Sequence, residues 1–191
     1  IVKDGAHSIE QGVGVRAVSG EKTGFAYSDS MDSASLLDSA RSARAISSGG
    51  NSFSHQSVKN AGTTTALYPA VDPVASMRAE QKVTLLRSVD AYVRSADSSV
   101  QKVTVSLAGA LDTILVVNSQ GVMAADIRPL VRLNVQVIVE QNGRRESGYA
   151  GGGGRFDYQE LFEGNRPYDI AQEALRQALV NLEAIDAPAG V

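Results

Sequence analysis

The sequence of 191 residues contains no cysteine and no tryptophan, and aromatic residues make up only 5% of it. The lack of cysteine excludes disulfides and thiolate metal ligands and is typical of the reducing cytoplasm. Few aromatic rings and a net charge of -3 provide neither a stacking surface nor a basic field for nucleic acid. No apolar run approaches the roughly 20 residues that span a bilayer. We therefore expect a cytoplasmic protein with no direct nucleic-acid partner and no membrane partner.

Histidine is also scarce. His7 and His55 stand in polar surroundings, and neither has a second histidine four residues away. A zinc motif cannot be built from them, and we interpret both as ordinary surface residues. The serine-rich segments contain no Gly-x-Ser-x-Gly elbow of a hydrolase. The residues by themselves predict no catalytic residue, no metal ligand and no cofactor on this chain.

The strongest local signals lie in Leu130–Arg155. Val131, Leu133, Val135, Val137 and Val139 alternate with mostly polar residues, which is the period of two of a half-buried strand. The dipeptide Asn142-Gly143 then predicts a type I′ hairpin turn, so a second strand should return to about Tyr149.

Four glycines and an arginine follow that strand, at Gly151, Gly152, Gly153, Gly154 and Arg155. Such a run forfeits backbone entropy on ordering and packs no side chains. A hinge or a close backbone contact is the favoured interpretation, ahead of a flexible loop and of a phosphate cradle closed by Arg155. A P-loop would need Gly-Lys-Ser/Thr opening a helix after a parallel strand, and the pattern here differs. The neighbouring charged residues are interpreted as a solvated sheet face: Asp126, Arg128, Arg132, Arg144, Arg145 and Glu146.

The N-terminal quarter predicts a hairpin and a helix. Two strands in 12–27 flank a turn at Ser19-Gly20-Glu21-Lys22. Asp32 or Ser33 can cap a helix that ends by Gly49-Gly50. Its expected apolar stripe is Leu36, Leu37, Ala40, Ala43 and Ile46. The polar composition of 47–62 predicts a mobile surface loop.

The rest of the chain predicts helices around a meander. A helix opened by Ser76 and Glu80 should run to about Asp97, with an apolar stripe of Val83, Leu86, Val89, Ala91 and Val93. Strands are expected at 100–107, 111–117 and 122–127, giving about five with the hairpin at Leu130. After a short amphipathic piece at 156–162, Pro167 opens a last helix whose expected buried face is Ile170, Ala174, Leu175, Ala178, Leu179, Leu182 and Ile185. The fold class is therefore α+β, an antiparallel β-meander with packed helices.

Three segments carry a family resemblance: GVGVRAVSGEKTGFAY from Gly12, AADIRPLVRLNVQVIVEQNGRRESGYAGGGGRF from Ala124, and ALVNLEAIDAPAG from Ala178. They closely resemble the TldD branch of the TldD/PmbA family of metal-dependent peptidases, also known as modulators of DNA gyrase. The likeness extends over essentially the whole chain and is weakest at 47–62.

The resemblance implies a subunit that cleaves unfolded or leader peptides and pairs with a PmbA/TldE-type partner in a heterodimer. The family's zinc site uses a His-Glu-x-x-x-His motif and a cysteine, and this sequence has neither. Residues 1–191 thus resemble an N-terminal domain without its first residues and without the C-terminal catalytic domain that would hold zinc. We expect the chain to be inactive alone, and no catalytic or metal residue is carried over.

Two functional interpretations remain open. In the first, a sheet edge or the Gly151–Arg155 segment pairs with an extended peptide and leads it to zinc in the neighbouring domain. In the second, the chain is a stand-alone binding or assembly module without peptidase activity. Either one leaves room for self-association through an exposed edge strand.

Overall fold

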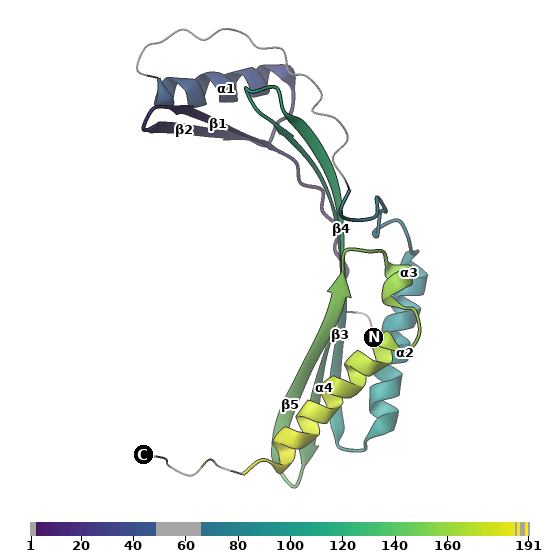
Figure 1. The fold of residues 1–191 in the computed structure, drawn as a ribbon. Coiled ribbons are helices and arrows are strands. Elements are labelled where there is room, and N and C mark those ends of the chain that lie inside the picture. The colour runs from purple at the N-terminus through teal and green to yellow at the C-terminus, as the bar shows by residue number, and fades with distance from the viewer. Residues whose placement is uncertain (1–2, 49–65, 186, 188–189, 191) are drawn as a thin grey trace. The chain divides into compact units, whose positions relative to one another are not determined.

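A computed structural model of the chain describes residues 3–48, 66–185, 187 and 190. The chain divides into two compact units (Figure 1). The hairpin unit spans residues 2–56, and the sheet unit spans residues 57–191. Most of the predicted loop at 47–62 lies outside the described residues, and Ser47 is the last residue of a helix instead.

The hairpin unit contains the predicted hairpin and helix. Strands β1 (Val13–Ser19) and β2 (Lys22–Ser28) pair antiparallel, and Gly20 has a φ of 57° at the turn between them. Helix α1 (Ser33–Ser47) follows. The Asp32 carboxylate caps α1 by accepting from the backbone N–H groups of Ala34 and Ser35 at 2.9 and 3.0 Å.

The predicted apolar stripe of α1 is partly wrong. Leu37 and Ile46 are 55% and 60% exposed, whereas Ser39, Ala43 and Ser47 are buried. The reason is the close approach of α1 to β2 at Gly24, where an added Cβ would meet the Ala43 carbonyl and lie 3.0 Å from Ile46 Cβ. Only small side chains fit between a helix and a strand at that separation.

The sheet unit is built in the order α2 (Ala79–Ala96), β3 (Val100–Val117), β4 (Met123–Gln141), β5 (Arg144–Gly154), α3 (Tyr158–Leu161) and α4 (Arg166–Glu183). The strands form one antiparallel meander in the order β3-β4-β5. This confirms the α+β class. The expected number of strands is wrong, because the segments on either side of 108–110 form one strand and those on either side of Pro129 form another.

Two residues that lie between the expected strands are inside the observed ones. Gly109 lies within β3, and the Tyr158 ring occupies the place of its missing side chain, with Tyr158 Cζ 2.8 Å from an added Cβ. Pro129 lies in β4 beyond the end of β5, which stops opposite Val131. The Pro129 carbonyl accepts from Arg155 Nη1 at 3.3 Å, so the residue faces the open side of β4 and its missing N–H breaks no ladder bond.

The core lies on one face of the sheet, under α2 and α4. The predicted alternation in β4 is confirmed, because its inward residues from Val131 to Val139 are fully buried. Val89 and Val93 of α2 and Ala171, Ala174 and Ala178 of α4 share clusters with them. In the described part of the chain, no helix covers the other face of the sheet, which carries mainly polar and small residues beside β5 and the apolar Ile114 and Val116 farther along β3.

Three helix details differ from the expectations. Helix α2 begins at Ala79, where the Gln81 side chain accepts from the Arg78 N–H, and not at Ser76. Ala91 on α2 is exposed. Ile185 lies beyond the end of α4 and is 90% exposed. No helix among the described residues is long and apolar enough to cross a lipid bilayer.

Candidate functional site

The β4–β5 hairpin forms as predicted, but β5 is longer than expected. Asn142 and Gly143 have φ of 53° and 80°, as a type I′ turn requires. The return strand does not stop near Tyr149. It continues through the four glycines, which pair with β4 from Asn134 to Val131. The glycine run is therefore part of the sheet and not a loop, and its extended amides do not converge on one point as a phosphate cradle needs.

Alternate glycines of β5 lie against the helix layer. An added Cβ on Gly152 would lie 2.8 Å from Ile170 Cδ1, and one on Gly154 would lie 2.8 Å from Phe156 Cζ. Gly148, earlier in the strand, meets α4 directly, since its Cβ would lie 2.5 Å from the Ala178 nitrogen. These glycines allow close approach, the contact interpretation that the sequence favoured together with a hinge.

Gly151 and Gly153 point to the opposite, open face. An added Cβ on Gly151 would collide with Asn134 Oδ1, and one on Gly153 would lie 2.8 Å from Arg132 Cα. Asn134 Oδ1 accepts from Arg132 Nε at 2.8 Å and from the Tyr149 hydroxyl at 2.7 Å. The glycines thus border a hydrogen-bonded polar cluster on a solvent-exposed face.

The outer edge of β5 is covered along only part of its length. The Ser147 carbonyl accepts from Asn181 Nδ2 at 2.9 Å, and the Tyr149 N–H donates to Gln177 Oε1 at 3.4 Å. Backbone groups of alternate residues point to the same side of a strand, so those of Gly151 and Gly153 also face outward. No residue in the described part of the chain bonds them.

Sequence reasoning had missed the two amides that cap this edge. Gln177 and Asn181 lie four residues apart on α4, beside its buried stripe, and that spacing of polar side chains was the available signal. Their position shows that α4 satisfies the half of the edge near the turn and leaves the glycine half open.

Arg155 follows Gly154 directly, at the end of this edge. Its guanidinium donates to the Pro129 carbonyl, and its Cζ lies 5.4 Å from the centre of the Tyr68 ring. Arg155 is therefore held at the junction of β5 with the free part of β4, close to the glycines.

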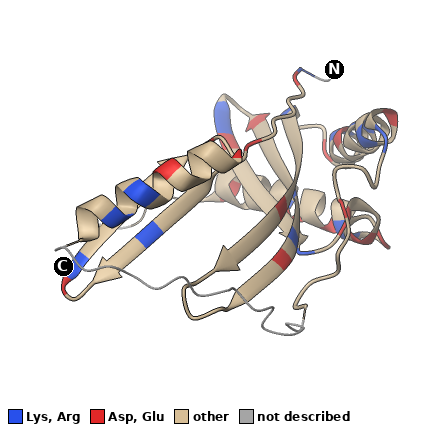
Figure 2. Cartoon of the chain, turned by 90° about the horizontal axis from the view of Figure 1, so that it is seen from above, with Lys and Arg blue, Asp and Glu red and all other residues tan. Residues whose placement is uncertain are grey.

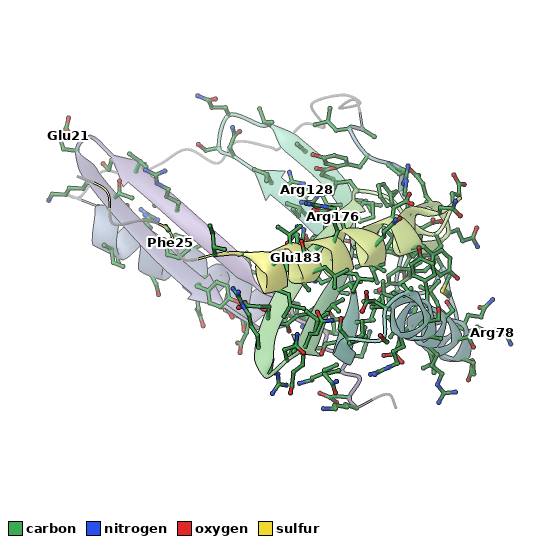
Figure 3. The ribbon with its side chains drawn as sticks, turned by 90° about the horizontal axis from the view of Figure 1, so that it is seen from below. Glu21, Phe25, Arg78, Arg128, Arg176 and Glu183 are labelled. Atoms are coloured by element: carbon green, nitrogen blue, oxygen red, sulfur yellow. The ribbon has the colours of Figure 1, made fainter. Side chains whose placement is uncertain are left out.

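Beyond the end of β5, strands β3 and β4 continue as a two-stranded ribbon, which we call the free part of the β3–β4 ribbon. A groove of about 440 Å³ lies on it, where residues 66–70 cover the open face of the sheet. Its lining is apolar, with Ile114, Val116 and Leu67, except for Tyr68 and an ion pair. In that pair, Arg128 (Figure 3) donates from Nε to Asp126 Oδ2 at 2.6 Å, and this hydrogen bond to the carboxylate raises the pKa of Arg128.

Arg144 of the predicted charged set also pairs with Glu146 at 3.2 Å, and it donates to the Asn181 and Ala184 carbonyls at the end of α4, so the set does not form one solvated face. No catalytic constellation forms around these charges in the described part of the chain.

The described residues do not fit a metal centre. No three His, Asp or Glu side chains in that part of the chain lie close enough together to hold an ion. His7 is exposed, and His55 lies outside the described residues.

Family comparisons agree with this division of the chain. A model of the PmbA/TldA metallopeptidase domain 1 matches residues 1–47, in the hairpin unit, and a model of the central domain of the same peptidases matches residues 72–182, in the sheet unit. The second match covers more than half of the chain. The chain belongs to the PmbA/TldD family of metallopeptidases.

Curated relatives place it in the TldD branch of that family. The metalloprotease TldD homologue of Haemophilus influenzae is 47% identical over 197 aligned residues, and that of Buchnera aphidicola subsp. Schizaphis graminum is 39% identical over 196. Both alignments include all of this chain. They include only 41% and 40% of the relatives, so the chain spans about two fifths of their length.

Solved structures share the fold. A proposed modulator of DNA gyrase from Thermotoga maritima has a TM-score of 0.68 at 15% identity, over 94% of this chain and 39% of that one. A second proposed modulator, from Bacteroides thetaiotaomicron, has a TM-score of 0.65 at 16% identity, over 88% and 39%.

Proposed function

We propose that this chain is a non-catalytic part of a TldD-type zinc metallopeptidase, and that the outer edge of β5 at Gly151–Gly154 binds the substrate peptide as an added strand. The observation that carries this proposal is the half-open edge. Gln177 and Asn181 occupy its first half, whereas the outward N–H and C=O groups of Gly151 and Gly153 have no partner among the described residues.

Strand addition suits the substrates expected of this family. Main-chain hydrogen bonds hold an extended peptide without reading its side chains, so unfolded and leader peptides of many sequences can bind. Glycines on the open face add no side chain that would crowd the incoming strand. Arg155, at the end of the edge, supplies a positive charge for a carboxylate of the peptide.

The proposal assigns peptide binding and catalysis to different parts of the full-length protein. Zinc, which would activate water for peptide hydrolysis, belongs to the remainder of the full-length protein, because the described residues of this chain offer no ligand set. The edge of β5 holds and aligns the peptide. Assembly with a PmbA/TldE-type subunit is the other part of the proposal.

Amide exchange in the full-length protein tests the edge directly. With zinc chelated so that cleavage stops, an unstructured peptide should slow exchange at Gly151 and Gly153 and leave Arg145, at the turn end of the same strand, unchanged. Unchanged exchange at the glycines would remove the proposal.

A proline variant supplies the kinetic test. Gly151→Pro, made with Asn134→Ala to clear the contact at Asn134 Oδ1, removes one outward N–H while the strand keeps its ladder to β4. We expect about a five-fold higher KM for an unstructured peptide, from the loss of one hydrogen bond, with the zinc content unchanged. Asn134→Ala alone and Arg145→Pro are the matched controls. Gly152→Val is less diagnostic, because Gly152 faces Ile170 in the core.

A further inference from the structure

Arg132 is a cation without a carboxylate beside it, next to the open half of the β5 edge. It is exposed on the open face of β4, with Ala108 of β3 on one side and Gly153 of β5 on the other. In the described part of the chain it forms no ion pair, whereas Arg128, the preceding arginine on the same face, is paired with Asp126. The charge of Arg132 is therefore available to an anion from outside the chain.

The guanidinium of Arg132 is directed towards the edge of β5. Its Nε donates to Asn134 Oδ1 at 2.8 Å, and the same oxygen accepts from the Tyr149 hydroxyl at 2.7 Å. Its Nη2 lies 3.1 Å from the position of an added Cβ on Gly151. The side chain of Arg132 thus crosses from β4 onto β5. Neither Nη atom has a hydrogen-bond partner among the described residues, so the outer end of the guanidinium is open.

The missing side chains of Gly151 and Gly153 expose this guanidinium to a strand that pairs with β5. In such a strand, the residue opposite Gly151 places its side chain on the same, open face. The Cβ positions of two directly opposed residues are about 5 Å apart, a distance that the carboxylate of Asp or Glu can bridge. That carboxylate would meet the Nη atoms of Arg132 with no side chain of β5 between them.

We propose that Arg132 gives the edge a preference for acidic peptides, by binding the carboxylate of an Asp or Glu side chain at the peptide residue opposite Gly151. This inference rests on the proposed strand addition at β5. Arg155 is less suited to this role, because its guanidinium donates to the Pro129 carbonyl and lies over the Tyr68 ring. The C-terminus of a peptide is the other source of a carboxylate, and the experiment must separate the two.

Binding of matched peptides to the full-length protein, with zinc chelated to stop cleavage, tests the preference. An unstructured peptide with one central glutamate is compared with the same peptide carrying glutamine there, and both ends of each are blocked. We expect the glutamate peptide to bind about ten-fold more tightly, because hydrogen bonds to a charged group are stronger than those to a neutral amide. The glutamine peptide with a free C-terminal carboxylate should not show this gain. If it does, the terminus is the ligand and the proposal is overturned.

Variants of the arginine assign the effect. Arg132→Gln should abolish the difference between the two peptides, and Arg132→Glu should favour lysine over glutamine at the central position. That reversal would also show that the variant is folded and binds peptide. Arg145→Gln is the control, because it removes a cation from the same face at the turn end of β5 and should keep the difference.

Amide exchange separates this inference from the strand addition on which it rests. If the glutamine peptide protects Gly151 and Gly153 but glutamate brings no gain, or the gain persists in Arg132→Gln, the acidic preference alone is refuted. If neither peptide protects the glycines, both proposals are refuted.

Discussion

At the scale of single residues, the polar side chains of α4 do more than cover its solvent face. Gln177 donates to Glu173 Oε1 at 2.9 Å and also accepts from the edge of β5. Glu173 is held in addition by Arg176, through bonds of 2.6 and 2.8 Å. The Glu173 carboxylate thus orients the Gln177 amide, which caps the edge of β5, and at the same time pairs with Arg176.

The Glu173 network predicts an acid-dependent stability. The hydrogen bond from Arg176, and then that from Gln177, lowers the pKa of Glu173 from 4.5 to about 2. A depressed carboxyl pKa stabilises the folded state above the unfolded pKa, and this contribution is lost as the pH falls from about 4.5 towards 2. Glu173→Gln should therefore be less stable than the parent at pH 6 and equal to it near pH 2.

Urea unfolding of the two proteins at a series of pH values checks this. Asp169→Asn, an exposed change on the same helix, is the control and should follow the parent. A stability difference that is the same at pH 6 and pH 2 would contradict the assigned cause.

At the scale of elements, the packing of α4 on β5 depends on a missing side chain. The helix passes over Gly148 so closely that an added Cβ would meet the Ala174 carbonyl and lie 3.0 Å from Gln177 Cβ. The small residues Ala171, Ala174 and Ala178 form the matching face of α4. The same small-on-small contact occurs in the hairpin unit between Gly24 and Ala43.

Gly148→Ala should displace α4 and destabilise the sheet unit by about 2 kcal/mol, a typical cost of overpacking a filled core. Thermal and urea unfolding measure the change. Because α4 carries the capping amides, the N–H of Tyr149 should also exchange faster in this variant. The neighbouring change Ser147→Ala, on the exposed side of β5, is the control and should be nearly neutral. A neutral Gly148→Ala would show that α4 does not rest on this strand.

At the scale of the whole molecule, the surface has two features that bear on partners. Positive and negative side chains are interspersed on the helices and strands (Figure 2), and no basic stripe forms on the described elements. This distribution of charge supports the prediction that the chain does not bind nucleic acid directly, which remains a prediction. Exposed apolar side chains form the second feature. They include residues of the free part of the β3–β4 ribbon and Phe25 on β2 (Figure 3).

The ribbon supplies a test of assembly with a PmbA/TldE-type subunit. Leu115, Val117 and Ile127 lie on the helix side of the sheet, beyond the helices, and Leu115 is 63% exposed. Leu115→Glu with Ile127→Glu should abolish co-purification of such a subunit, because an apolar contact surface tolerates no buried unpaired charge.

The control for that experiment is Thr104→Glu, which places one charge on the opposite, open face of β3. It should leave co-purification unchanged, since it adds no charge to the apolar surface. Undiminished co-purification by the double variant would place the partner on another surface. Unchanged circular dichroism separates lost binding from lost folding.

Much of the local structure could be predicted because it depends on neighbours in the chain. The alternation from Val131 to Val139, the Asn142-Gly143 turn and the Asp32 cap each express a steric or hydrogen-bonding preference within a few residues. The resemblance of the three quoted segments to the TldD branch was also available from the sequence, and the comparisons confirm it.

What the sequence by itself determined was therefore the fold class, the two hairpins and the three longer helices, the buried face of β4 and the family. Only the tertiary structure decided that Gly109 and Pro129 lie inside strands, that the glycine run belongs to β5, and that half of its edge is open. Those features depend on contacts with Tyr158, Arg155 and α4, which are distant in sequence. The sequence does not distinguish a glycine that a turn requires from one that a closely packed helix requires. The neighbour that packs against the glycine distinguishes them, and it is known only from the structure.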